Sequence, residues 1–398
     1  MPIDKRGEIE PKAEAVVDAA AEAAGGPVSP KARRADDPDI ALAIDKMIEQ
    51  VGATPGSFDA RLVRELMQTA LKLIPDGRDT GEIKLITNSV KELRYAYRVF
   101  GKYQEPHKVT IFGSARTPET HPDYHACVEF SRLMAEAGWM SITGAGLGIM
   151  KAGHVGPGRK SSFGVAIRLP FETTANQVIA GDEKLIQFRY FFTRKLMFVS
   201  QAEAVALFPG GFGTLDEAYE ALTLVQTGKS TPMPIVMVEG AGGSYWPNWE
   251  KWVKENLLAH GWISPEDPGI YYIAKDPADA VRHIVHFYRN YHSSRYVKDD
   301  FVVRLNKPIR HEDVQKLEDE FRILIKEGGS MSQSPGPVEG EDDHPTLPRL
   351  VFRHTKHKFG LIRRLIDRIN ALEPATEPVP PPKVSVVKKA PVTGPGTV

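Results

Sequence analysis

The amino-acid sequence predicts an α/β protein built on a doubly wound parallel sheet, with an N-terminal helical extension and a small C-terminal α+β extension. From Lys108 onward, short apolar segments alternate with segments of helical periodicity. The short segments are apolar at nearly every position, which is typical of parallel strands that are covered on both faces. Several of them run directly into glycine-rich turns, as strand ends do in sheets of this class.

Residues 105–295 contain five expected strands: Val109–Phe112, Trp139–Thr143, Phe163–Leu169, Ala202–Phe208 and Pro234–Val238. The expected helices are Asp123–Ala137, a helix opened by Gly144–Gly148, Thr214–Thr227, Trp249–His260 and Asp276–Tyr291. Because parallel strands are joined by crossovers, their carboxyl ends meet at one edge of the sheet, where ligands of such proteins bind.

The flanking segments predict separate units. Residues 38–104 form the helical extension, with helices expected near 40–48, 62–74 and 82–100. Residues 296–372 form the α+β extension, in which a polar insert, Gly328–Pro345, divides two strand–helix pairs: 301–305 with 312–326, and 350–352 with 359–372. Residues 1–37 and 373–398 are rich in proline or charge and poor in large apolar side chains, so both are expected to be disordered tails.

Composition excludes several classes of function. The 398 residues hold 51 Lys and Arg against 51 Asp and Glu, so no net charge attracts nucleic acid or an anionic membrane, and neither is expected as a partner. The basic segment Arg349–Arg368 favours a solvated helix face. The single Cys127 is expected to be a buried core thiol. Histidines such as His283 and His286 lack the partners of a metal site, so no metal or cofactor is expected. We expect a cytoplasmic protein without a membrane span.

The strongest functional signal is the segment Pro209–Glu217, Pro-Gly-Gly-Phe-Gly-Thr-Leu-Asp-Glu, which follows an apolar strand and opens an amphipathic helix. Its glycines let backbone amides approach a phosphate group. Thr214 is placed either to cap the helix or to bind a phosphate oxygen, and Glu217 would complete a capping box. A capping box does not require three glycines and a proline before it. The segment therefore predicts a ligand-binding loop.

A second signal is the segment Phe191–Val199, which is strongly apolar except for Arg194 and Lys195. Paired cations in a buried helix are costly unless an anion meets them, which predicts an anionic ligand. The alternative is a solvated helix face with snorkelling side chains. The pattern alone leaves both interpretations open.

Two weaker signals lie nearby. Gly144–Gly148 resembles part of a dinucleotide-binding fingerprint, but its spacing is G-x-G-x-G and no acidic residue ends the next strand, so it indicates phosphate binding more than NAD. Glu172 lies just past the third expected strand, at the ligand-binding edge. Binding of a substrate hydroxyl and simple helix capping are equally compatible with that position.

Together these motifs resemble the LOG (Lonely guy) family, many members of which were once labelled "possible lysine decarboxylase". The resemblance covers about residues 105–290 and rests on five segments: Gly113–Arg116, Gly144–Met150, Leu169–Glu172, Phe191–Lys195 and Pro209–Glu217. It implies a Rossmann-like domain that hydrolyses a nucleoside 5′-monophosphate, such as AMP or a cytokinin riboside monophosphate, to free base and ribose 5-phosphate. It also implies a homo-oligomer, a dimer or larger.

By the same resemblance, Arg194 and Glu217 would be the catalytic pair. The implied substrate-binding residues are Ser114, Gly144, Gly146, Gly148, Glu172, Lys195, Gly210, Gly211, Phe212, Gly213, Thr214, Leu215, Asp216 and Thr223. The sequence departs from the family where Lys151 replaces the usual glutamate and where Ala152-Gly-His154 replaces an Ala-Ala-Asn-like run. These departures concern the shape of the base pocket.

Two other functions compete with hydrolysis. One is a non-catalytic protein that binds a nucleotide or molybdenum cofactor, since related Rossmann-like proteins carry that cofactor; the presence of both Arg194 and Glu217 favours the enzyme. The other is amino-acid decarboxylation, which needs a lysine that forms a Schiff base with pyridoxal phosphate. Lys195, beside an arginine and near a phosphate loop, does not suit that role.

Overall fold

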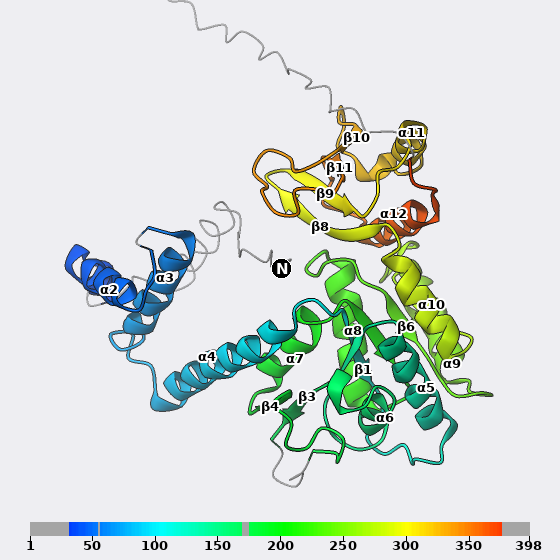
Figure 1. Cartoon of the computed structure of the whole chain (residues 1–398), viewed down its shortest axis with the longest axis horizontal. Helices are drawn as coiled ribbons and strands as arrows, with labels where there is room; N and C mark the ends of the chain where they lie inside the picture. Colours follow the sequence, from blue (N-terminus) through cyan, green and yellow to red (C-terminus); the bar gives the residue numbers. More distant parts are fainter. Residues whose placement is uncertain (1–31, 55, 169–174, 376–398) are drawn as a thin grey trace, which may run out of the picture.

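The computed structural model describes residues 32–54, 56–168 and 175–375 and confirms the α/β fold (Figure 1). A seven-stranded, wholly parallel sheet forms its centre, in the order β4-β3-β2-β1-β5-β6-β7. Its strands are β1 (Lys108–Phe112), β2 (Met140–Thr143), β3 (Ser162–Ile167), β4 (Leu185–Phe188), β5 (Ala204–Leu207), β6 (Ile235–Met237) and β7 (Tyr271–Ile273).

Helices cover both faces of this sheet. One face packs against α4 (Thr80–Phe100), α7 (Phe191–Ser200), α8 (Phe212–Gln226) and α9 (Tyr245–Trp252), which a π-helical turn, Val253–Leu258, continues. The other face packs against α5 (Pro122–Glu136), α6 (Ile149–Val155) and α10 (Pro277–Phe287). Alternate residues of each strand point to opposite faces, so Ile111 joins the second core and Phe112 the first. Cys127 is fully buried in the second core, as expected.

The strand order reverses direction between β1 and β5, because the chain winds from β1 out to β4 and then returns to β5 beside β1. At such a switch point the loops after the two strands diverge to opposite faces and leave a crevice at the carboxyl ends. The loops concerned here are Gly113–Arg116 after β1 and Phe208–Gly211 after β5.

The five expected strands correspond to β1, β2, β3, β5 and β6. Two edge strands, β4 and β7, were not predicted, because they are only partly buried and neither runs into a glycine-rich turn. The last predicted helix, Asp276–Tyr291, is wrong at its end: α10 stops at Phe287, and Tyr291 begins the next strand. Leu169, the predicted end of the third strand, lies outside the described residues.

The C-terminal extension is a four-stranded antiparallel sheet in the order β10-β11-β9-β8, packed against two helices. It comprises β8 (Tyr291–Val297), β9 (Asp300–Leu305), α11 (His311–Glu320), β10 (Met331–Ser334), β11 (Arg349–Phe352) and α12 (Phe359–Ala371). Strand β10 lies inside the segment predicted to be a polar insert, and the helix predicted over 312–326 ends at Glu320, so both predictions are corrected. Residues 376–398 lie outside the described part of the chain.

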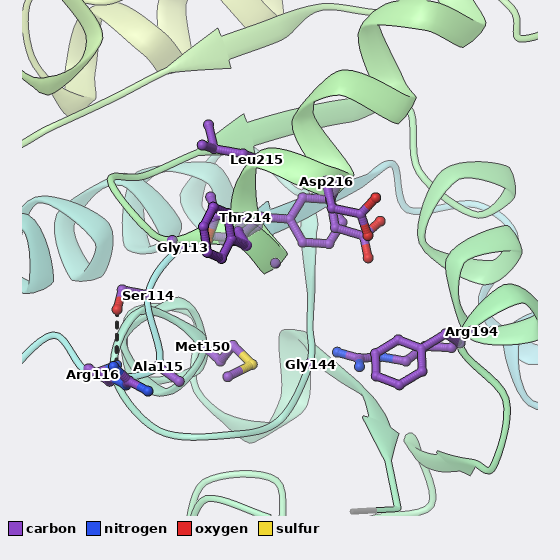
Figure 2. A pocket seen from close by; sticks show the side chains of 17 residues that line it. Gly113, Ser114, Ala115, Arg116, Gly144, Met150, Arg194, Thr214, Leu215 and Asp216 are labelled. Atoms are coloured by element: carbon purple, nitrogen blue, oxygen red, sulfur yellow. Dashed lines mark hydrogen bonds between the residues drawn. The ribbon is translucent and has the colours of Figure 1, made fainter. Parts of the chain in front are cut away.

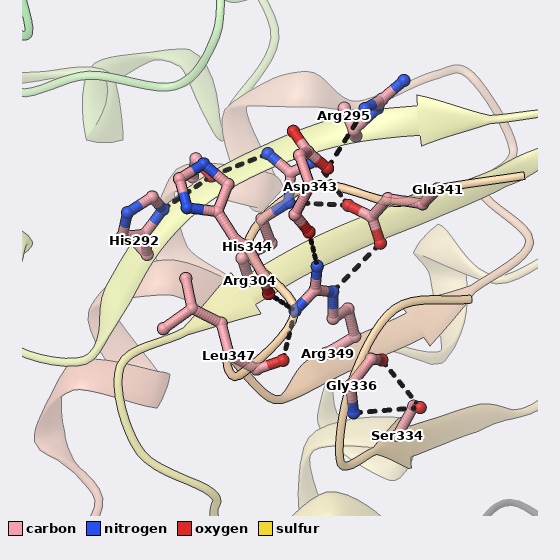
Figure 3. A network of polar contacts seen from close by, with 11 residues as sticks. His292, Arg295, Arg304, Ser334, Gly336, Glu341, Asp343, His344, Leu347 and Arg349 are labelled. Atoms are coloured by element: carbon pink, nitrogen blue, oxygen red, sulfur yellow. Dashed lines mark hydrogen bonds and ion pairs between the residues drawn. The ribbon is translucent and has the colours of Figure 1, made fainter.

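A buried charge network fixes the loop between β10 and β11 to this sheet (Figure 3). Glu341, whose side chain is 0% exposed, accepts hydrogen bonds from Nε of Arg304 at 2.7 Å and from Nε of Arg349 at 3.0 Å. Arg349 also donates to the backbone carbonyls of Asp343, His344 and Leu347. The expected solvated face is therefore wrong at Arg349, and also at Arg363, which is buried between α12 and α10.

The N-terminal helices α2 (Pro38–Gln50), α3 (Phe58–Lys72) and α4 confirm the predicted extension. The pair α2 and α3 has a small core of its own, formed by Ile44, Ile48 and Ala60. The long helix α4 connects this pair to the parallel sheet, against which it packs by Ala96, Val99 and Phe100 (Figure 1). A 3₁₀ turn, Ala32–Asp36, precedes α2, and residues 1–31 of the predicted tail lie outside the described residues. None of the helices described is long and apolar enough to cross a membrane.

A half-buried histidine connects the helices that cover the two sheets. Nε2 of His283 on α10 lies 2.7 Å from Nη2 of Arg363 on α12, and its ring stacks on Tyr272 at 4.0 Å. Because burial and the Arg363 charge both disfavour a second proton, the pKa of His283 falls to about 4. The neutral ring can then accept the Arg363 hydrogen bond.

This arrangement predicts a loss of stability in mild acid. The unfolded chain takes up a proton at His283 near pH 6.5, whereas the folded chain does so only near pH 4, so the free energy of unfolding should decrease as the pH falls through this window. His354, which is buried and has a pKa of about 4, adds to the same trend. Denaturant titrations at pH 7, 5.5 and 4 measure it. His283→Gln should flatten part of the pH dependence, whereas His125→Gln, at an exposed position, should leave it unchanged.

Candidate active site

A cavity of about 760 Å³ lies at the switch point, beyond the carboxyl ends of β1, β2 and β5 (Figure 2). It has the size of pockets that enclose small organic ligands, about 300–1,000 Å³. The residues that line it are Ile111, Phe112, Gly113, Ser114, Ala115, Arg116, Gly144, Met150, Phe191, Arg194, Gly211, Phe212, Gly213, Thr214, Leu215, Asp216 and Glu217.

The loop after β5 opens α8 directly into this cavity. Helix α8 begins at Phe212. Gly211 occupies the N-cap position and has no side chain that could cap the helix. Thr214 is therefore the third residue of the helix and not its cap, so the capping-box interpretation of Thr214 and Glu217 is wrong. The backbone amides at a helix start lack partners within the helix and attract anions. This end of α8 is suited to bind a phosphate group.

Two glycines of the loop are not required by the packing of the protein. A Cβ atom built on Gly211 or Gly213 meets no atom of the described residues within 4 Å, and neither residue has a positive φ. By contrast, a Cβ on Gly210 would collide with the Thr214 side chain and approach the Ser114 amide. Gly210 thus packs the loop, while Gly211 and Gly213 leave open space in the cavity wall that a ligand can occupy.

Glu217 is the most enclosed carboxylate of the cavity, with a side chain only 12% exposed. Burial raises its pKa above the ordinary value, although the nearby charges of Lys195 and Arg194 act in the opposite direction. A carboxyl group with a raised pKa is suited to exchange protons with a substrate near neutral pH.

Lys195 does not line the cavity, in contrast to its predicted contact with substrate. Its Nζ atom lies 2.8 Å from Asp216, 3.3 Å from Glu217 and 2.7 Å from Glu220. Burial acts to lower the pKa of Lys195, but hydrogen bonds to Asp216 and Glu220 outweigh it and raise the pKa. A lysine held in its protonated form by carboxylates orients Glu217 and is unsuited to form a Schiff base.

Arg194 reaches the same cavity from α7. Its Nε atom donates a hydrogen bond to the carbonyl oxygen of Val165 at 3.0 Å, and its guanidinium lies 5.1 Å from the ring centre of Phe198. A Cβ on Gly144 would lie 2.7 Å from Arg194 Nη2, so the guanidinium passes close to this glycine. Figure 2 shows Arg194 and Gly144 on one side of the cavity and Asp216 and Thr214 on another.

The Gly144–Gly148 turn has a mainly structural role. Gly148 has a φ of +57°, and a Cβ there would collide with the Ser114 carbonyl, so the turn packs tightly on the loop after β1. His154, fully buried, holds the turn from below: its Nε2 lies 2.9 Å from Thr143 Oγ1, which accepts the Ala145 amide. His154 is a core histidine, and burial lowers its pKa.

The structure brings ten predicted site residues to the cavity: Ser114, Gly144, Arg194, Gly211, Phe212, Gly213, Thr214, Leu215, Asp216 and Glu217. Five others do not line it: Gly146, Gly148, Lys195, Gly210 and Thr223. Glu172 lies outside the described residues. The lining residues Arg116, Met150 and Phe191 were not assigned a role, although each belongs to a motif that the sequence marks. Among the residues described, no group of three or more His, Cys, Asp or Glu is placed to hold a metal ion.

Part of the chain is similar to a known protein family. Residues 146–284 match the sequence model of the family described as "Possible lysine decarboxylase". A search of curated proteins finds no match.

Solved structures with similarity to this chain include three that cover less than half of it. The X-ray structure of TM1055, a structural genomics target, is 21% identical and covers 45% of this chain and 98% of its own, with a TM-score of 0.33. The molybdenum cofactor carrier protein from Chlamydomonas reinhardtii is 20% identical over 46% of this chain and 97% of its own, with a TM-score of 0.33. The molybdenum cofactor binding protein from Rippkaea orientalis gives the same identity and coverage and a TM-score of 0.32.

Proposed function

We propose that the protein hydrolyses the N-glycosidic bond of a nucleoside 5′-monophosphate, releasing the free base and ribose 5-phosphate. The LOG-family domain over residues 146–284 supports a nucleotide-related function. The observation that carries the specific proposal is that Arg194 and Glu217 both line a cavity into which the start of α8 opens. A cation, an acid and an anion-binding helix end are the groups that this reaction needs.

The proposed chemistry follows from where charge develops. The bond between the ribose carbon C1′ and the base nitrogen breaks, and positive charge accumulates on the ribose ring, as in glycoside hydrolysis. The phosphate would bind at the amides that start α8, beside Gly211 and Gly213. Water adds to C1′, its proton is transferred away, and the departing base nitrogen gains one.

In this proposal Glu217 stabilises the ribose cation or removes the proton of the attacking water, and Arg194 anchors the phosphate or assists the leaving base. The enclosure of Glu217 strengthens its electrostatic effect, because few water molecules screen it. Lys195 and Asp216 fix the direction of the carboxylate. Homo-oligomer assembly and a cytoplasmic location stay predictions.

The proposal is tested by incubating the purified protein with AMP, GMP, CMP, UMP and isopentenyladenosine monophosphate and separating the products by chromatography. Release of free base and equimolar ribose 5-phosphate from at least one of them is expected. If none is cleaved but one or more bind, the protein is a nucleotide-binding or cofactor-binding module and the hydrolase proposal is wrong.

The open space around Gly213 gives a separate prediction. Gly213→Ala should raise the free energy of unfolding by about 0.5–1 kcal/mol, because alanine stabilises a helix relative to glycine. The same methyl group occupies ligand space and should weaken the binding of ribose 5-phosphate at least tenfold. Denaturant unfolding and calorimetric titration measure the two effects. Gly101→Ala, which also meets no atom within 4 Å but lies outside the cavity lining, should leave binding unchanged. Unaltered binding in Gly213→Ala would exclude the loop as a ligand site.

A further inference from the structure

Helix α7, which carries Arg194, is held at its N-terminus by a side chain from the N-terminal extension. Its first residues follow Tyr190, which provides no side-chain cap. Glu92, near the middle of α4, instead binds the residues on either side of this start. Its Oε1 accepts a hydrogen bond from the backbone amide of Arg189 at 2.8 Å, and its Oε2 accepts one from the hydroxyl of Thr193 at 2.8 Å. Its negative charge also lies at the positive end of the α7 dipole, where it is favourable.

The first turn of α7 adjoins the cavity, because Phe191 and Arg194 line it. Thr193 is 1% exposed and is followed by Arg194. Space for the Arg194 guanidinium is tight, since it passes Gly144 closely and donates to the Val165 carbonyl on β3. A small rotation of α7 about its axis would therefore break this hydrogen bond or drive the guanidinium against the Gly144 turn.

Helix α4 is itself fixed to the strand that receives Arg194. The ring of Phe100 stacks on Phe163 of β3 at 4.4 Å, and the following turn is anchored by Tyr103, whose hydroxyl donates to Glu183 at 2.7 Å. Glu92 thus connects α7 to a helix that packs directly against β3. The orientation of Arg194 relative to Val165 depends on this connection.

We propose that Glu92 is a positioning residue, through which the N-terminal extension sets the orientation of Arg194 in the active site. This inference rests on the proposed function for the role of Arg194. Residues 146–284, which match the family model, do not include Glu92. The N-terminal extension thus provides a contact to α7 that the matched segment does not contain. Catalytic groups must be held within about 0.5 Å of the productive geometry. A hydrogen bond to Thr193, the residue before Arg194, is therefore significant.

A plain structural cap and a positioning residue predict different results. Loss of a structural cap lowers stability but leaves ligand affinity and turnover unchanged in the folded molecules. Loss of a positioning residue acts through Arg194, so its effect disappears once the Arg194 side chain is removed. Glu82 in the first turn of α4 offers a matched control, because it is an exposed glutamate whose partner, Arg78, lies 3.8 Å away on the surface.

The test is a double-mutant cycle on the full chain, with ribose 5-phosphate as the probe, titrated by calorimetry. Glu92→Ala should weaken binding about tenfold in the otherwise unaltered protein and less than twofold in Arg194→Ala, whereas Glu82→Ala should change neither. Glu92→Gln, which keeps one acceptor, should recover part of the affinity. An equal loss in both backgrounds, or no loss in either, overturns the proposal.

Two further measurements separate this proposal from the hydrolase proposal. Amide hydrogen exchange over 190–195 should accelerate at least tenfold in Glu92→Ala and not in Glu82→Ala, whether or not any nucleotide is cleaved. If AMP is a substrate, kcat should fall in Glu92→Ala by more than KM rises. Absence of turnover in the unaltered protein would reject the hydrolase alone, whereas unchanged exchange in Glu92→Ala would reject the positioning role alone.

Discussion

Replacing Glu217 with glutamine is expected to lower the rate of base release from a nucleoside monophosphate by 10²–10⁴-fold, about the contribution of a positioned acid or base. The substitution removes one negative charge while keeping the shape of the side chain. Lys195 still pairs with Asp216 and Glu220, so the fold should survive. The rate constant is measured by chromatography of the released base, and the thermal midpoint confirms that the protein is folded.

The matched control for this variant is Glu220→Gln. Glu220 pairs with the same lysine at 2.7 Å but does not line the cavity, so its replacement should change the rate by less than about threefold. Arg194→Ala should reduce the rate by about 10²-fold or more, the usual effect of losing a preorganised cationic donor. If Glu217→Gln and Glu220→Gln behave alike, the carboxylate of Glu217 acts only on Lys195 and takes no direct part in the reaction.

The largest effect on stability is expected at Glu341. Replacing it with alanine leaves the guanidinium groups of Arg304 and Arg349 buried without their carboxylate, which should lower the free energy of unfolding by about 3–5 kcal/mol. Denaturant unfolding followed by circular dichroism measures this change. Glu339→Ala is the control, since Glu339 is 93% exposed and pairs only with exposed Lys298, and it should cost less than about 1 kcal/mol.

The same network has a pH dependence of defined sign. Burial would raise the pKa of Glu341, but hydrogen bonds from Arg349 and Arg304 outweigh it and hold the pKa below its usual value. The stabilisation is therefore complete above the pKa of an unfolded glutamate, near pH 4.5, and is lost as the pH falls below it. If Glu341→Ala and Glu339→Ala lose similar amounts of stability, the buried network contributes no more than a surface pair.

The sequence predicts which segments line the cavity, because glycine follows each strand that ends there. Gly113, Gly144 and Gly210 directly follow or closely follow apolar segments, and parallel topology brings their ends together without any further information. The role of Lys195 could not be predicted in the same way. Its pairing with Asp216, Glu217 and Glu220 depends on how α7 faces α8, and helix rotation is set by packing and not by local sequence.

The buried arginines were also beyond sequence analysis. Arg304 and its partner Glu341 are 37 residues apart, and a basic segment such as Arg349–Arg368 has the composition of a solvated surface. Burial of these side chains requires a carboxylate from a loop whose path is not encoded by periodicity. Glu92 was missed for the same reason, since it meets Arg189 and Thr193 across 97 and 101 positions of the chain.

Helix α8 gives the molecule a direct mechanical link between its two sheets. Its first amides face the cavity, and after 15 residues, a span of about 22 Å, it ends at Gln226. Two residues further on, a Cβ at Gly228 would collide with the ring of Phe359 at the start of α12. Because an α-helix transmits an axial push with little compression, a shift of the antiparallel sheet along this line would move the amides that face the cavity. The C-terminal extension thus contacts the far end of the helix whose first residues line the cavity.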